Sequence, residues 1–74
     1  MAAEYADRLM ALAIDRILGE SPKAFRVLAH QKHGWVPKSI LHIDDVRWLQ
    51  EERFKVPKKP LLVDVPRWFR LKWG

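Results

Sequence analysis

The residues with the clearest chemical potential lie near the end of the chain, in the stretch RWFRLKW at positions 67–73. Aromatic and cationic side chains alternate there, and in a β-strand successive side chains point to opposite faces. A strand would turn the apolar side chains to one face: Phe69, Leu71 and Trp73. The other face would present Trp68 beside Arg70 and Lys72, which suits stacking on a nucleobase with phosphates held alongside. The alternative is structural: Trp68 packs on a helix while the two cations extend over it into water.

Further cations flank this stretch. The segment KVPKKP at 55–60 has two prolines in six positions, so it cannot form regular structure and is predicted to be a basic loop. We therefore predict that one surface, running from this loop to the outer face of the last strand, binds nucleic acid. Its members are Lys55, Lys58, Lys59, Arg67, Trp68, Arg70 and Lys72.

The distribution of charge indicates a polyanion as the partner. The 74 residues include 14 Lys and Arg against 9 Asp and Glu, which gives a net charge of +5. Residues 21–39 carry four bases and no acid, and residues 55–74 carry six bases and one acid, whereas the segments 1–20 and 40–54 are each net acidic. Such blocks favour one polyanion-facing side over even solvation. Ordinary solvated lysines are the alternative.

Other groups that could do chemistry are poorly arranged. His30 and His33 could share one helical face, with His42 or Asp44 completing a metal site. The HExxH motif is missing, however, and the chain has no cysteine. The carboxylates of Asp44 and Asp45 are adjacent, and adjacent residues on a helix point in different directions. We therefore expect neither an enzyme, nor a metal site, nor a cofactor.

Apolar periodicity and capping residues predict the elements that position these residues. Helices are expected at 4–18, 22–32, 38–42 and 45–54, with Asp44 capping the last. A short strand at 34–37 and two strands at 61–65 and 67–73, joined at Pro66, are expected to form a small antiparallel sheet. Burial is expected for Leu9, Ile14, Ile17, Phe25, Leu28, Val36, Leu41, Leu49, Val63, Phe69 and Leu71.

The segment GWVPKSIL at 34–41 resembles the start of the winged-helix unit in La-type RNA-binding modules and in RNA 2′-phosphotransferases. The expected order of elements is also similar to the winged-helix plan. This resemblance implies an α+β fold: a single winged-helix-like domain over residues 1–74, with three to four helices and a C-terminal two- or three-stranded antiparallel sheet. The helix at 45–54 takes the recognition position but is net acidic, so we do not expect it to read a major groove.

The expected function is that of a small basic protein that binds RNA in preference to DNA. It would contact mainly the backbone of the nucleic acid, and it would act within a ribonucleoprotein. One alternative is a non-catalytic accessory subunit of a large protein assembly, with Trp48 and Trp68 as interface anchors. A second alternative is a DNA-binding transcription regulator. No stretch is long and apolar enough to span a membrane, and a cytoplasmic location is expected. The oligomeric state stays open.

Overall fold

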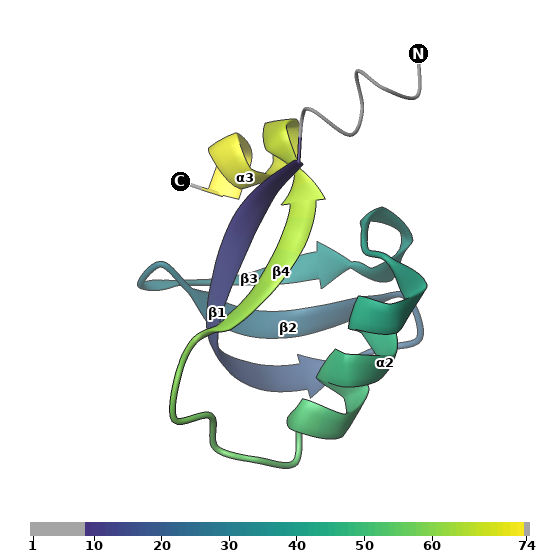
Figure 1. Ribbon diagram of the computed structural model, residues 1–74, viewed down its shortest axis with the longest axis vertical. Helices are drawn as coiled ribbons and strands as arrows, with labels where there is room; N and C mark the ends of the chain where they lie inside the picture. Colours follow the sequence, from purple (N-terminus) through teal and green to yellow (C-terminus); the bar gives the residue numbers. More distant parts are fainter. Residues whose placement is uncertain (1–8, 74) are drawn as a thin grey trace.

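The computed structural model describes residues 9–73, which form a four-stranded antiparallel sheet and two α-helices. Along the chain the elements are β1 (Leu9–Glu20), β2 (Ala24–Ala29), β3 (Lys32–Pro37), the single 3₁₀ turn η1 (Lys38–Ile40), α2 (Ile43–Glu52), β4 (Leu61–Pro66) and α3 (Arg67–Trp73). The strand order β3-β2-β1-β4 makes β3 and β4 the edge strands. Figure 1 shows α2 beside the sheet and α3 next to the upper ends of β1 and β4.

β1 is long because it pairs with a different strand in each half. Its first half pairs with β4 and its second half pairs with β2, and Ile14 takes part in both ladders. Register shifts fall between Ile14 and Arg16 and between Ile17 and Gly19, and such bulges bend and twist a strand. As a result β4 runs steeply across the direction of β2 and β3 (Figure 1). The sheet therefore curves around its inner face.

The core lies inside this curved sheet. The strands turn alternate apolar side chains inward, and α2 contributes Val46 and Leu49 to the same cluster. The largest fully buried side chains are Phe25, Leu12, Ile14, Leu49, Val27, Val36 and Val65. Burial of these side chains fixes which face of each strand remains at the surface.

The winged-helix prediction is wrong, and the first predicted helix shows why. Residues 4–8 of that helix lie outside the described residues, and its remainder belongs to strand β1. The bulge after Ile14 places the next buried side chain at Ile17, three residues later. A spacing of three is also typical of one face of a helix, so the bulged strand imitates helical periodicity.

The second predicted helix, 22–32, is instead β2 and the turn that leads into β3. Ser21 makes the hydrogen bonds of a helix N-cap, because its Oγ accepts from the N–H groups of Lys23 (3.3 Å) and Ala24 (3.0 Å). Here these bonds close a turn, after which β2 runs back along β1. The same local hydrogen bonds serve turns and helix starts, which is why the serine did not distinguish the two.

The last predicted strand, 67–73, is the helix α3. Phe69 and Trp73 are one helical turn apart and both pack against the core, so the i, i+4 spacing replaces the expected period of two. Leu71 was expected to be buried with them, but it lies on the opposite side of the helix and is 61% exposed. No helix within residues 9–73 is long and apolar enough to cross a membrane.

The remaining elements lie close to their predicted positions. The helix expected at 45–54 is α2, which begins at Ile43 and is capped by His42 in place of Asp44: the Asp44 N–H donates to His42 Nδ1 at 3.1 Å. The helix at 38–42 is only η1, the strand at 34–37 is part of β3, and the strand at 61–65 is β4. The residues correctly expected to be buried are Ile14, Ile17, Phe25, Val36, Leu41, Leu49 and Val63, whereas Leu28 and Phe69 are half-buried and Leu9 is exposed.

At the end of β1, the Glu20 carboxylate connects three elements. It accepts hydrogen bonds from Lys38 and from Gln50 (2.9 Å) on Oε2 and from Arg53 (2.8 Å) on Oε1. These bonds, that from Lys38 foremost, lower the pKa of the Glu20 carboxyl from 4.5 to about 2. The Arg53 guanidinium also lies 4.7 Å from the centroid of the Phe54 ring. Two of the chain's cations are thus engaged in holding this end of the fold together.

Candidate functional site

The structure does not bring the predicted nucleic-acid-binding residues into one continuous row. Lys55, Lys58 and Lys59 precede β4, whereas the others lie in α3, which follows it. A strand of six residues spans about 17–20 Å, so the two groups lie at opposite ends of β4. Figure 1 shows the loop that carries the lysines at the lower end of β4 and α3 at the upper end.

Between β3 and α3 lies a groove of about 420 Å³. Its lining residues are Lys32, His33, Gly34, Trp35 and Pro37 from β3 and Trp68, Phe69, Lys72 and Trp73 from α3. Two of the indoles are exposed, Trp35 at 53% on the β3 side and Trp68 at 60% on the α3 side. Lys32 and Lys72 are exposed as well, and no lining residue is acidic. The groove, hereafter the β3–α3 groove, therefore combines accessible aromatic faces with positive charge.

Trp73 fixes α3 against the sheet. Its Nε1–H donates to the carbonyl oxygen of Ala29 at 2.9 Å, and its ring lies against Gly34. A Cβ atom at position 34 would come within 2.5 Å of this ring, so any larger residue there would have to displace the indole. The Phe69 ring lies 5.8 Å from the rings of both Trp68 and Trp73. Aromatic contacts thus connect the exposed Trp68 to a buried anchor.

Arg70 lies beside the turn between β2 and β3. Its Nη2 lies 3.3 Å from His30 Nδ1, and the Ala13 N–H lies 3.2 Å from the other ring nitrogen, Nε2. A neutral imidazole accepts at one nitrogen only, so the ring bonds one of these two donors and packs against the other. Arg70 is half-buried at this contact. Of the other predicted residues in α3, Trp68 and Lys72 line the groove and Arg67 is exposed at the start of the helix.

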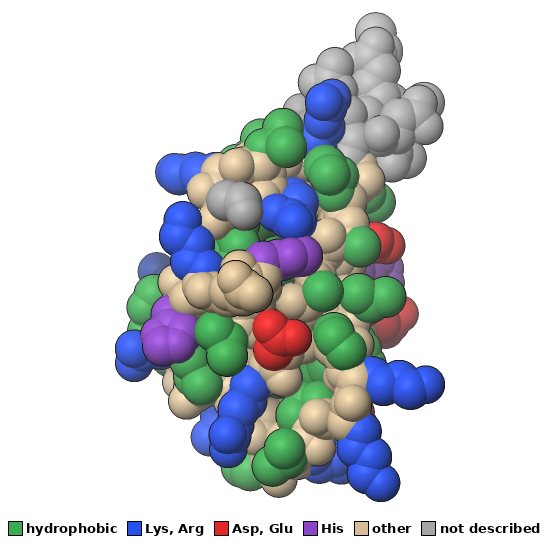
Figure 2. All heavy atoms as spheres, turned by 90° about the vertical axis from the view of Figure 1, so that its left-hand side faces the viewer, with side chains coloured by type: hydrophobic (Ala, Val, Ile, Leu, Met, Phe, Trp, Pro, Cys, Tyr) green, Lys and Arg blue, Asp and Glu red, His purple; other side chains and the backbone are tan. Residues whose placement is uncertain are grey.

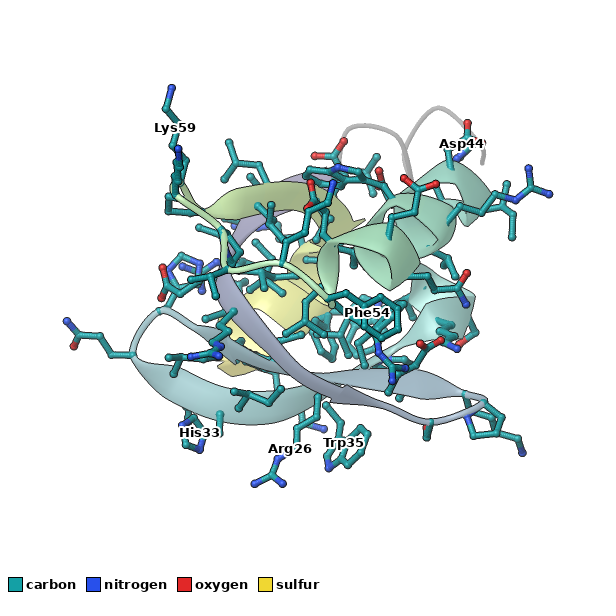
Figure 3. All side chains as sticks on the ribbon, turned by 90° about the horizontal axis from the view of Figure 1, so that it is seen from below. Arg26, His33, Trp35, Asp44, Phe54 and Lys59 are labelled. Carbon is teal, nitrogen blue, oxygen red and sulfur yellow. The ribbon has the colours of Figure 1, made fainter. Side chains whose placement is uncertain are left out.

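Trp35 also belongs to the outer face of the β2–β3 hairpin. It lies opposite Arg26 in the ladder, two residue pairs from His33 and its partner Leu28. Figure 3 shows Arg26, His33 and Trp35 projecting from the same side of the sheet, away from the core. Side chains directly opposite on a sheet have Cβ atoms about 4.5–5.5 Å apart, so Arg26 is within reach of a ligand stacked on Trp35.

These hairpin residues are missed from the sequence because the helix predicted at 22–32 hides the turn between two strands. The signal that could have found them is the alternation in AFRVLA, where Phe25, Val27 and Ala29 are buried and the residues between them are not. The same alternation places Val36 inside and Trp35 outside after the turn. Lys32 and His33, which border the groove, follow directly from that register.

The basic loop forms a separate surface. Lys55, Lys58 and Lys59 border a hollow of about 440 Å³, together with Trp48 and the loop prolines. Lys55 lies 3.8 Å from the Glu52 carboxylate, which offsets part of the charge. Trp48 packs against the core and is only partly buried. Trp48 therefore closes the core on one side and lines the hollow on the other.

The two surfaces face different directions. Figure 2 shows basic side chains spread over the face turned toward the viewer, with acidic side chains only near its middle and its right edge. In Figure 3, Lys59 points away from the side on which Arg26 and Trp35 project. A ligand seated on the β3–α3 groove would therefore not meet the loop lysines without bending around the molecule.

Among residues 9–73, no group of three His, Cys, Asp or Glu side chains is placed to hold a metal ion. Comparisons of the chain with protein-family models, with curated proteins and with solved structures find no match. The function is therefore inferred from the geometry and charge of the two surfaces.

Proposed function

We propose that this protein binds single-stranded nucleic acid, with RNA favoured over DNA, in the β3–α3 groove. The observation that supports the proposal is the pair of exposed indoles, Trp35 and Trp68, on the two sides of a groove that carries lysines and no acid. Proteins that bind single strands commonly combine aromatic stacking planes with a positive groove that follows the backbone.

The requirement for a single strand follows from the aromatic faces. In a duplex the faces of the bases are covered by their neighbours, whereas in single-stranded loops and ends they can stack on side chains. RNA is the favoured partner because its loops, bulges and ends present such unstacked bases. Trp35 and Trp68 supply the planes, and Lys32, Lys72 and Arg26 are placed to meet the phosphates.

The loop lysines provide a second phosphate contact in this proposal. Lys55, Lys58 and Lys59 are exposed, and they lie about one strand length from α3. Only a nucleic-acid strand long enough to reach both the groove and the loop can contact these lysines. Helix α2 carries Asp44, Asp45, Glu51 and Glu52, and we propose that it does not lie against phosphates.

Fluorescence anisotropy with single-stranded RNA, single-stranded DNA and both duplexes, across a salt series, tests the proposal. Single strands should bind best, and the affinity should fall as salt rises. Replacing Trp35 or Trp68 with Ala should weaken binding by about 1–3 kcal/mol if a base stacks there. The matched control is Phe54→Ala, which removes an aromatic side chain that is 79% exposed outside the groove. Equal losses in the control and the tryptophan variants would argue against the groove.

A non-catalytic subunit of a protein assembly is the second candidate. It is favoured by large apolar side chains exposed outside the groove: Phe54 at 79%, Val56 at 74% and Leu62 at 62%. Exposed apolar residues of this kind are typical of protein interfaces when they form a patch. A complex held by them should depend weakly on salt, whereas nucleic-acid binding depends on it strongly.

A further inference from the structure

The turn between β2 and β3 determines which main-chain groups of β3 are paired. His30 and Gln31 form the turn with φ angles of 51° and 64°, both in the left-handed region. Two such residues between paired strands make a type I′ hairpin, in which the flanking residues exchange both main-chain hydrogen bonds. Here the flanking residues are Ala29 and Lys32.

Every second pair along the ladder then repeats this exchange, so Gly34 bonds to Val27 and Val36 bonds to Phe25. The hydrogen bond from the Lys38 N–H to the Lys23 carbonyl oxygen, at 2.8 Å, falls in the same phase beyond the end of β3. The residues between, His33 and Trp35, must therefore turn their N–H and C=O groups away from β2.

That direction is the one in which the groove lies. β3 is an edge strand, so no further strand covers His33 and Trp35 on that side within residues 9–73. Both residues line the β3–α3 groove, whereas no residue of β2 does. Two N–H donors and two C=O acceptors thus face the groove beside the exposed indoles.

We infer that the free edge of β3 hydrogen-bonds the polar edges of bases held in the β3–α3 groove, through the main chain of His33 and Trp35. This inference rests on the proposed function and specifies the ligand further. All nucleobases carry both donors and acceptors on their edges. The main-chain edge of β3 offers both donors and acceptors. It can therefore hydrogen-bond any of the nucleobases, but it needs a base to be present. The ligand class is therefore a single strand with an intact, unstacked base, of unrestricted sequence.

Amide hydrogen exchange followed by NMR tests the inference on the protein side. In the free protein, the amides of His33 and Trp35 should exchange faster than those of Gly34 and Val36, which are bonded to β2. Saturation with an eight-nucleotide oligouridylate should slow exchange at His33 and Trp35 by at least about 10-fold, with smaller changes at Gly34 and Val36. If the oligonucleotide binds but leaves these two amides unchanged, the inference is wrong and the proposed function stands.

Modified oligonucleotides test it on the ligand side. One set carries an abasic site at a single position, and a second carries difluorotoluene, a base analogue that stacks but hydrogen-bonds poorly. The analogue should weaken binding about 2- to 10-fold, the loss of one or two net hydrogen bonds, and the abasic site should weaken it more because stacking is lost too. Equal affinity for uracil and the analogue would overturn the inference while leaving stacking intact.

Two further outcomes separate the remaining possibilities. The proposed function requires that the oligonucleotide binds in a salt-dependent way and that Trp68→Ala weakens this binding. If either result is missing, the proposed function fails and this inference fails with it. An eight-residue peptide of alternating Glu and Val is the second probe, because an extended acidic peptide can add to an exposed sheet edge by the same main-chain bonds. Protection of His33 and Trp35 by the peptide alone would overturn base recognition in favour of strand addition.

Discussion

At one end of the sheet α3 is held by a buried indole, whereas at the other end α2 is held by a carboxylate shared among three side chains. The Trp73 ring fills the space over Gly34 and donates one hydrogen bond to Ala29. Glu20 instead gathers Lys38, Gln50 and Arg53 at the start of η1 and the end of α2. Both ends contain cations, but they use them differently.

The difference shows that a basic sequence segment is not by itself a ligand surface. At the α2 end Lys38 and Arg53 are engaged by Glu20, so much of their charge serves the fold. At the α3 end apolar burial holds the helix, and Lys32 and Lys72 stay exposed around the groove.

The largest effect should come from Trp73→Ala. Removing a buried tryptophan leaves a cavity and an unpaired Ala29 carbonyl group, so the free energy of unfolding should fall by about 3–5 kcal/mol. Trp68→Ala is the matched control on the same helix, and because its indole is 60% exposed it should cost less than about 1 kcal/mol. Urea denaturation followed by circular dichroism measures both. Similar losses for the two variants would mean that Trp73 is not the anchor.

The two described glycines of the sheet should respond differently to a methyl group. Gly34→Ala places Cβ against the Trp73 ring, and overpacking of this kind should cost about 1–3 kcal/mol. At Gly19 an added Cβ would have the Cβ of Arg26 as its nearest neighbour, at 4.0 Å. Gly19→Ala should therefore change the free energy of unfolding by less than about 1 kcal/mol. Thermal unfolding of the pair compares them directly. A tolerated Gly34→Ala would contradict the close approach of the indole.

The α2 end should be sensitive to acid. Because the folded pKa of Glu20 is lowered from 4.5 to about 2, its contribution to stability is fully present above 4.5 and is lost as the pH falls through about 2. Glu20→Gln should cost roughly 1–2 kcal/mol at pH 7 and flatten the stability profile between pH 4.5 and 2. Urea unfolding across that pH range measures it.

Glu51→Gln provides the control, since Glu51 is an exposed carboxylate on α2, the helix that the Glu20 network holds. It should leave both the stability and its pH profile nearly unchanged. If Glu20→Gln retains the full acid sensitivity of the parent protein, another carboxylate is responsible and the Glu20 network is weak.

The smallest effects should distinguish the lysines of the two ends. Lys72→Ala should weaken binding to all single strands and reduce the slope of log affinity against log salt by about one unit. Lys59→Ala should have little effect on a short oligonucleotide and a comparable effect only on one long enough to reach the loop. Anisotropy titrations with 6- and 20-nucleotide RNAs would show this. An equal effect of Lys59→Ala on both lengths would place the loop inside the primary site.

The parts of the fold that the sequence predicted are those with one dominant local pattern. The helix α2 and the strand β4 have regular apolar spacing, and the prolines mark the loop between them. β1 was mistaken because its bulges change the phase between Ile14 and Ile17. RWFRLKW fits a strand and a helix equally well over seven residues. The helix is favoured because the absence of a side chain at Gly34 leaves space for the Trp73 ring, and Gly34 lies in a distant part of the sequence.

The candidate site was predictable to the same extent. Trp68 and Lys72 stand out because aromatic and basic residues alternate near them. Trp35 and Lys32 join them only through the hairpin, and Arg26 only through the ladder partner of Trp35. Such pairings bring distant positions together, and no window of the sequence shows them.

The double pairing of β1 leads us to expect a particular order of assembly. Ile14 pairs with Ala29 in one ladder and with Leu61 in the other. Closing the shorter loop costs less chain entropy, so the β1–β2–β3 meander should form early and the β1–β4 ladder late. Because α3 follows β4 directly, the groove becomes complete only in that final closure. A ligand that bridges β3 and α3 therefore holds together the last part of the molecule to fold. Unfolding should begin with the release of this part, so the bound ligand should slow unfolding.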